Sequence, residues 1–200
     1  SLANFKEEAV NEVIDGFDAA SAPEDFVLKR LEAAMLGMGK KQDVNALTDM
    51  ITNGTQVTGE VALTKTNIFG EVMKLKGLLD SQKAPADNRY LICDVTAYNL
   101  LIQDSNFLLQ TAPAQDIKFS GQVYQGAGFY LIMEPSMPAG TSMVAVQKRG
   151  YAHRDEFKYN PTIVSLEGSA AFIGDSALKA RNIYVQGVLR APLVQIYATV

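Results

Sequence analysis

The chain has 200 residues, 48% of them hydrophobic and 20% charged, which is enough to bury a sizeable core in one domain or in one domain with a lobe. Its net charge of -4 and its scattered basic residues argue against a dedicated nucleic-acid binder, which needs clustered Lys and Arg for phosphate contacts. No apolar run approaches the ~20 residues that a membrane span requires, so no membrane partner is expected.

The first fifty residues predict three helices. Phe5 to Phe17 carries apolar side chains at helical spacing and charged side chains on the other face. A second helix is expected from about Glu24 to Leu36, with Pro23 in its first turn and the two glycines of residues 37–39 marking its end. Residues 43–50 predict a third, short helix.

The next fifty residues predict alternating strands and helices. A weak strand is expected over Gln56–Leu63 and a longer helix over Ile68–Leu79. A buried strand over Tyr90–Cys93 and a further helix over Ala97–Gln103 follow. Gly59 weakens the first strand. The longer helix repeats apolar residues at helical spacing, and Thr64 or Thr66 can cap it. Asp94 or Thr96 can cap the last helix.

From residue 104 onward the chain predicts one long loop followed mostly by strands. Asp104–Ser120 is polar and contains proline, and a loop of this length is usually functional or mobile. Tyr151–Tyr159 mixes aromatic and charged residues. The expected strands are Ile117–Tyr124, Phe129–Met133, Met143–Val146, Thr162–Leu166, Ile183–Leu189 and Leu193–Ala198. These elements place the chain in the α+β class, with antiparallel β structure in the final fifty residues.

Two residues are candidates for catalysis. His153 is the single histidine, and Asp155 follows two positions later, but no Gly-x-Ser-x-Gly elbow supplies a nucleophile for a triad. A surface or interface imidazole is therefore the favoured interpretation of His153. Cys93 is the single cysteine, which excludes an intrachain disulfide framework, and its apolar strand predicts a buried, inert thiol.

Glycine-rich and acidic segments also lack the spacing of known sites. Residues 121–128 match neither a phosphate loop nor a dinucleotide fingerprint, because a strand rather than a helix follows them, so a hairpin or a bulge is expected. The carboxylates of Asp15, Asp18 and Asp87 do not follow the ligand periodicity of a calcium loop. We therefore predict no catalytic, cofactor-binding or metal-ligating residue, and no cofactor.

The chain from about Ile68 to Val200 carries a series of short signals in a characteristic order. They are Leu78-Leu79-Asp80 at a helix end, the linker Ala84-Pro85-Ala86-Asp87, Arg89 before a strand, Leu100-Leu101 in a helix, Gly128-Phe129 before a strand, the turn Ser136-Met137-Pro138-Ala139-Gly140-Thr141, Met143–Val146, Asp155-Glu156-Phe157 and Arg190-Ala191-Pro192-Leu193. In this order they resemble the major capsid (coat) proteins of tailed bacteriophages, which have the Hong Kong 97-type fold. No single motif is diagnostic, and the order of the signals carries the resemblance.

The resemblance implies an axial domain and a peripheral domain. Residues 1–50 would be peripheral-domain helices, residues 51–149 the axial domain, and residues 150–200 the peripheral β segment with a returning C-terminal strand. The long helix of the family is usually uninterrupted, whereas Pro23 is expected to break or restart it here. Family members carry an N-terminal arm and an extended loop before that helix, so the resemblance implies a truncated or matured chain.

The resemblance also implies a structural protein rather than an enzyme. Copies would form the pentamers and hexamers of an icosahedral phage or prophage shell, in the virion and, during assembly, in the bacterial cytoplasm. Other implied partners are scaffolding and portal proteins and packaged DNA bound without sequence specificity. Tyr151–Tyr159 suits a contact between copies, since Tyr, Phe and Arg are enriched at interfaces, and Asp104–Ser120 is a candidate for contacts at the capsomer axis. A solvated charged hairpin and a disordered loop remain the alternatives for these two segments.

Two other functions remain open at this point. An encapsulin-type shell shares the fold but encloses protein cargo, and a cargo-peptide groove in the peripheral domain would distinguish it. A small α/β hydrolase or transferase acting through His153 belongs to a different class, and loss of an activity in His153→Ala would support it.

Overall fold

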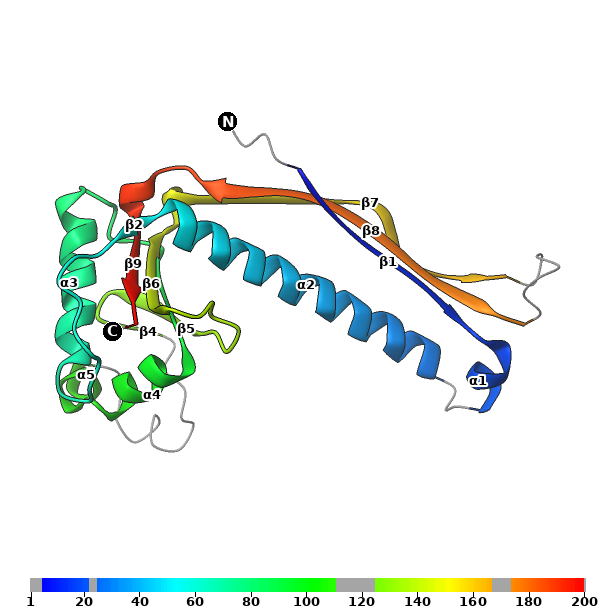
Figure 1. The fold of residues 1–200 in the computed structure, drawn as a ribbon, viewed down its shortest axis with the longest axis horizontal. Coiled ribbons are helices and arrows are strands. Elements are labelled where there is room, and N and C mark those ends of the chain that lie inside the picture. Colours follow the sequence, from blue (N-terminus) through cyan, green and yellow to red (C-terminus); the bar gives the residue numbers. More distant parts are fainter. Residues whose placement is uncertain (1–4, 22–24, 111–124, 167–173, 200) are drawn as a thin grey trace. The chain divides into compact units, whose positions relative to one another are not determined.

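The computed structural model describes residues 5–21, 25–110, 125–166 and 174–199, and the chain divides into two compact units. The first unit comprises residues 1–43 and 153–186, and the second comprises residues 44–152 and 187–200. The first unit holds β1 (Lys6–Ile14), α1 (Gly16–Ser21), the first part of α2 (Phe26–Asn53) and most of β7 (Tyr151–Ser165) and β8 (Ser176–Val188) (Figure 1). The second unit holds the end of α2, β2 (Thr55–Gln56), α3 (Ile68–Ser81), β3 (Arg89–Cys93), α4 (Val95–Gln103), α5 (Ser105–Gln110), β4 (Gln125–Gly126), β5 (Phe129–Met133), β6 (Thr141–Gln147) and β9 (Val194–Ala198).

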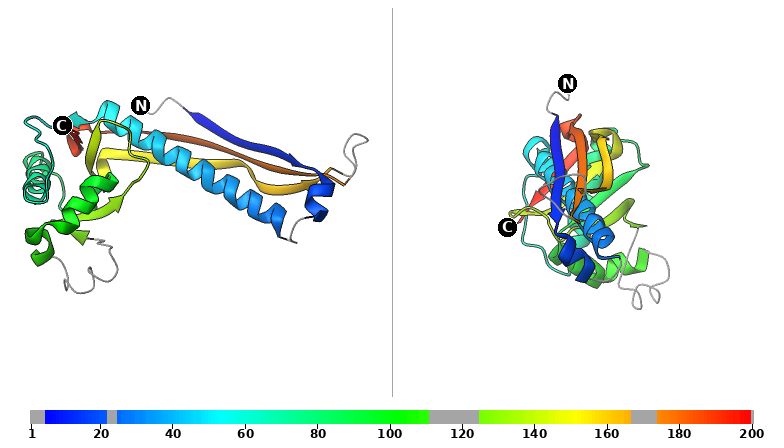
Figure 2. Two further views of the ribbon diagram at one scale, coloured as in Figure 1. Left: turned by 60° about the horizontal axis from the view of Figure 1, so that its bottom comes forward. Right: turned by 90° about the vertical axis from the view of Figure 1, so that its right-hand side faces the viewer.

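The predicted helix over residues 5–17 is wrong, because most of this segment is strand β1. β1 pairs antiparallel with β8 in a sheet of order β1-β8-β7, which runs alongside α2 (Figure 2). From its third residue on, every second residue of β1 is at least partly buried. Two of these inward residues are Glu8 and Glu12, which pair with Lys41 and Arg30 of α2. The alternation typical of a strand is hidden in the sequence because half of the inward positions are charged.

α2 is one helix of 28 residues, whereas two helices, over residues 24–36 and 43–50, are expected from the sequence. It continues through Gly37 and Gly39, the residues expected to end it. A Cβ added at either glycine would meet nothing within 4 Å, so neither glycine is needed for close packing. Apolar side chains of α2, including the buried Leu31, contact β1 and β8 and hold the helix together despite the glycines. Pro23, expected to break or restart the helix, lies outside the described residues.

The glycines of α2 provide a stability prediction. We expect Gly37→Ala and Gly39→Ala each to raise the free energy of unfolding by about 0.5–1 kcal/mol, because alanine loses less backbone entropy in a helix. Urea denaturation measures the change. Gly54→Ala is the matched control and should destabilise, because its Cβ would lie 2.5 Å from Ile196 Cδ1 and 2.6 Å from the Met50 carbonyl oxygen. Destabilisation by both α2 variants would contradict a continuous helix.

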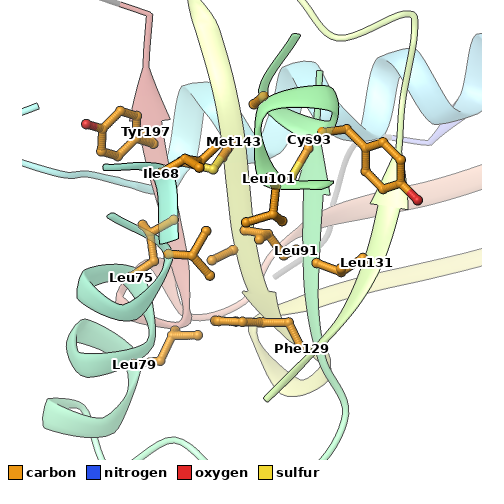
Figure 3. Close-up of a cluster of buried hydrophobic side chains, with 14 of the residues drawn as sticks. Ile68, Leu75, Leu79, Leu91, Cys93, Leu101, Phe129, Leu131, Met143 and Tyr197 are labelled. Carbon is orange, nitrogen blue, oxygen red and sulfur yellow. The ribbon is translucent and has the colours of Figure 1, made fainter. Parts of the chain in front are cut away.

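The second unit is built on a mixed six-stranded sheet of order β2-β9-β6-β3-β5-β4. β3 is parallel to β5 and antiparallel to β6, and β6 is antiparallel to β9. Helices α3 and α4 pack on one face of this sheet. Ile68, Leu75 and Leu79 of α3 meet Leu91 of β3 and Phe129 of β5 in the main hydrophobic cluster (Figure 3). The end of α2 packs against the opposite face through a smaller cluster.

Several predicted elements of the second unit are confirmed with small shifts at their ends. They are the helices α3 and α4 and the strands β3, β5, β6 and β9. The Oδ1 atom of Asp94 accepts a hydrogen bond from the Ala97 amide at 2.6 Å, so Asp94 is the cap of α4. The expected caps of α3 are wrong, because its N-cap is Asn67. In place of the weak strand expected over residues 56–63, the structure has only the two-residue strand β2.

Other expectations differ more from the structure. The segments 151–159 and 162–166 form the single strand β7, apart from the last residue, and β8 begins at Ser176 rather than at Ile183. The loop expected over residues 104–120 contains the short helix α5. Residues 111–124, with the rest of that loop and the strand expected over 117–124, lie outside the described residues.

The expected domain division of 1–50, 51–149 and 150–200 differs from the two units most at the C-terminus. Residues 187–200 belong to the second unit, because β9 pairs with β2 and β6 of its sheet. A sequence pattern marks β9 as a strand but does not show which sheet it joins.

Candidate functional site

His153 lies on β7 in a cluster with residues of β8. Its Nδ1 atom is 3.2 Å from Gln186 Oε1, and its Nε2 atom is 3.8 Å from Asp155 Oδ1. The imidazole stacks on the ring of Tyr184 with a centroid separation of 6.0 Å. A catalytic base must lie within hydrogen-bond reach of the group that it deprotonates. The two polar partners of the imidazole are the amide of Gln186 and the carboxylate of Asp155, and neither is a nucleophile that a base would activate. This geometry favours a structural role for His153.

Cys93 lies at the end of β3 in the main hydrophobic cluster and is fully buried. Burial and, to a smaller extent, the charge of Asp94 raise the pKa of the Cys93 thiol far above its ordinary value. The thiolate is the reactive form, so this cysteine is not suited to nucleophilic chemistry.

The burial of Cys93 predicts its reactivity. We expect the native protein to react very slowly with a thiol reagent such as Ellman's reagent, and the protein in concentrated guanidinium to react at once with one equivalent. The absorbance of the released thiolate measures both rates. Rapid labelling of the native protein would show that β3 is not covered as the structure has it.

The glycine-rich and acidic segments form local turns. Ala127 and Gly128 have positive φ values of 52° and 83° and join β4 to β5 in an antiparallel hairpin, as expected for this part of residues 121–128. Asp15 Oδ1 accepts a hydrogen bond from the Phe17 amide, and Asp87 Oδ2 accepts one from its neighbour Asn88. Within the part of the chain that the structure describes, no group of three or more His, Cys, Asp and Glu side chains is arranged to hold a metal ion.

β7 is an exposed edge strand. It has 15 residues, lies at one end of the sheet order β1-β8-β7, and is exposed at every position from 153 to 163. Phe157, Tyr159 and Ile163 are among its exposed residues, beside charged neighbours. A long edge strand with exposed apolar side chains is a typical site for contact with another chain. The segment Tyr151–Tyr159, for which an interface is expected, therefore lies on a surface suited to one.

A second apolar surface lies on β3 and β5, where Tyr130 and Ile132 of β5 are exposed and Tyr90 and Ile92 of β3 are half-buried. Tyr130 of β5 is 43% exposed and its ring centroid is 5.5 Å from that of Tyr90, the residue opposite it on β3. Ile132, 41% exposed, lies opposite Ile92. We call these four residues the β3–β5 surface. The uniformly apolar sequence of β5 is typical of a strand buried on both faces, so the sequence does not reveal this exposure.

Comparison with known proteins separates sequence from fold. No protein-family model and no curated protein matches the sequence. Solved structures do match. A chain of Mycobacterium phage Che8 superposes with a TM-score of 0.77 at 14% identity, over 96% of this chain and 70% of that one. A chain from the capsid structure of the cyanophage P-SCSP1u superposes with a TM-score of 0.77 at 14% identity, over 97% of this chain and 72% of that one. A chain from the mature capsid of bacteriophage PhiM1 superposes with a TM-score of 0.68 at 10% identity, over 97% of this chain and 71% of that one.

This chain has the fold of a phage capsid protein. The resemblance expected from residues 68–200 is thereby confirmed at the level of the fold, and the phage-capsid fold extends over the N-terminal strand and helix as well. None of the helices described here has the length and apolarity of a bilayer span.

Proposed function

We propose that this protein is the capsid subunit of a tailed phage or prophage, and that copies of it assemble into the icosahedral shell that encloses DNA. The observation that carries the proposal is the match of almost the whole chain to chains of phage capsid structures, with a TM-score of up to 0.77. Because one fold can serve several functions, the exposed surfaces supply a second argument.

Both units present surfaces suited to lateral contacts. The first unit has the exposed edge strand β7, and the second has the apolar β3–β5 surface. Shell subunits meet through heterologous contacts that close into rings, and exposed strand edges and apolar patches are the surfaces that such contacts bury. These surfaces support a subunit that functions by contact with its own copies.

The two units correspond to the domains of this proposal. We assign the first unit to the peripheral domain and the second unit, including residues 187–200, to the axial domain. The pairing of β9 with β6 supports the placement of the C-terminal strand in the axial domain.

The proposal also assigns partners and location. Copies form pentamers and hexamers, scaffolding and portal proteins join them, and the net charge of -4 fits packaged DNA that is enclosed without sequence-specific binding. The protein acts in the virion after assembly in the bacterial cytoplasm, and its role is structural rather than enzymatic.

The β3–β5 surface provides a test of assembly. We expect the double variant Tyr130→Ser, Ile132→Ser to leave the fold intact but to reduce the assembled fraction by roughly tenfold or more, because it removes exposed apolar side chains from a contact. Sedimentation of the longest form that the gene encodes, purified from expressing cells, measures that fraction.

Val61→Ser is the matched control, because Val61 is also exposed in the second unit but lies outside the β3–β5 surface. It should sediment as the unmodified protein does. If both variants assemble equally, the β3–β5 surface is not a contact between copies. If the unmodified protein does not assemble at all, the proposed capsid function is wrong. A shell that retains a defined protein cargo instead of DNA would support the encapsulin-type alternative.

A further inference from the structure

A shallow groove of about 420 Å³ crosses the three strands of the first unit. Small and apolar residues of β1 and β8 line part of it. Asn11 and Tyr159 also line it, together with three basic side chains, Lys158 from β7 and Lys179 and Arg181 from β8, and no carboxylate is among its lining residues. Arg154 lines an adjoining hollow of about 330 Å³ that also includes Lys158 and the carboxylates of Asp155 and Glu156. We call the larger hollow the basic groove.

Acidic neighbours neutralise only part of this charge. Arg181 Nε lies 2.6 Å from an oxygen of Glu7, a contact that lowers the pKa of Glu7, and Lys158 Nζ lies 2.8 Å from an oxygen of Glu156. Among the described residues, neither Arg154 nor Lys179 forms a close ion pair, although the charge of Arg154 helps to lower the pKa of Glu156. The groove and its rim therefore hold four basic and three acidic side chains, Asp155 being the third carboxylate, and carry an excess of one positive charge on a chain whose net charge is -4.

The segment that follows β1 presents the opposite chemistry. Asp15, Phe17 and Asp18, which we call the α1 tip, are all exposed, and no basic residue lies between residues 15 and 21. Phe17 is 78% exposed, the highest value for a large apolar side chain in the described part of the chain. Burying such a side chain against another surface is favourable. The tip thus combines one apolar anchor with two negative charges.

We infer that the α1 tip of one copy docks into the basic groove of a second copy, an inference that rests on the proposed shell function. Phe17 lies against the exposed Ala9 in the groove, while Asp15 and Asp18 supply negative charge opposite its positive excess. Because tip and groove are different surfaces, the contact is heterologous, and repetition of it from copy to copy closes a ring.

The chemistry of the tip favours a protein occupant over a nucleic acid. The phosphate backbone of DNA can also bind a basic groove. DNA in the groove would not account for the exposed apolar ring of Phe17, however. A second copy accounts for both the charge excess of the groove and the exposed aromatic ring of the tip.

The test uses two variants that each disable one side of the contact. The tip variant carries Phe17→Ser and Asp18→Lys, and the groove variant carries Lys158→Glu and Lys179→Glu. Arg181 and Asp15 are left unchanged because they hold Glu7 and the Phe17 amide within the subunit. Circular dichroism checks the fold, and sedimentation velocity over a concentration series measures the association of each variant alone and of an equimolar mixture.

Each variant alone is expected to associate roughly tenfold more weakly or worse than the unmodified protein. The mixture is expected to form a complex with one copy of each, because the tip variant retains an intact groove and the groove variant an intact tip. High salt should weaken this complex. A control that reverses charges elsewhere, Glu32→Lys with Lys65→Glu, should associate as the unmodified protein does.

A mixture that forms no complex would overturn the inference, as would an unmodified protein that shows no association. A double-stranded DNA oligonucleotide provides the other arm. If it binds the unmodified protein and the tip variant but not the groove variant, and the mixture does not complement, the groove holds DNA and the inference is wrong. If the tip variant and the groove variant each form shells, the inferred contact is wrong but the proposed function stands. If the mixture forms a complex but the unmodified protein forms no shells, the contact is supported and the shell function is not.

Discussion

Replacement of Arg89 by alanine is expected to lower the free energy of unfolding by about 2–5 kcal/mol. The side chain is only 2% exposed and makes three contacts at the start of β3. Nε donates to the Pro85 carbonyl at 2.8 Å, an Nη atom donates to the Ala84 carbonyl at 2.6 Å, and the other Nη atom lies 2.7 Å from Asp80 Oδ1. Alanine leaves both carbonyl groups without these donors and opens a cavity. Urea denaturation measures the loss.

Two controls make the Arg89 prediction specific. Lys65→Ala removes a basic side chain from an exposed position and should change stability by less than about 0.5 kcal/mol. Asp80→Asn should cost less than Arg89→Ala, because the amide oxygen can still accept from the guanidinium and both carbonyl contacts remain. A loss below about 1 kcal/mol for Arg89→Ala would contradict the buried position of the guanidinium.

The variant Tyr197→Phe is expected to lower the free energy of unfolding by about 1–3 kcal/mol. The ring of Tyr197 is fully buried, and its hydroxyl accepts a hydrogen bond from the Val61 amide at 2.9 Å and donates one to the Val61 carbonyl at 3.0 Å. Burial raises the pKa of Tyr197, so the hydroxyl keeps its proton and remains a donor. Phenylalanine preserves the packing but leaves both backbone groups of Val61 without their partner.

Hydrogen exchange and a matched variant test this role of Tyr197. The Val61 amide should exchange faster in Tyr197→Phe, while amides of β3 remain protected. Tyr130→Phe removes a hydroxyl from an exposed ring and should change neither stability nor exchange. Unchanged exchange at Val61 would show that the hydroxyl does not hold the segment that follows β2.

The fold of the second unit is the part that the sequence predicts best. α3 shows a stripe of buried residues at helical spacing, and β3 and β6 are short apolar runs between turns, so local pattern and tertiary burial agree. Asp94 is recognisable as a cap because it directly precedes its helix.

The first unit is harder to predict because its elements depend on distant partners. β1 places Glu8 and Glu12 on its inward face, where they pair with Lys41 and Arg30 of α2, partners that no local pattern reveals. Gly37 and Gly39 suggest a helix end, but packing of α2 outweighs a local cost of about 1 kcal/mol for each glycine. Helical spacing also assigns Phe17 to an apolar face, whereas the structure exposes it.

The candidate surfaces are only partly visible in the sequence. The mixture of aromatic and charged residues marks β7 as suited to an interface, but its position at a sheet edge appears only in the structure. The β3–β5 surface and the basic groove combine residues that lie far apart in the chain, such as Tyr90 with Tyr130 and Lys158 with Lys179. Pairing across strands brings them together, and no local pattern encodes it.

Electron microscopy of the purified protein, in the longest form that its gene encodes, tests the shell function most directly. The proposed shell function predicts rings of five and six copies or closed shells, with the second unit around the ring axis and the first unit at its periphery. A protein that remains monomeric over the whole range of concentration and salt, or that forms only an ordinary two-fold dimer, would contradict it.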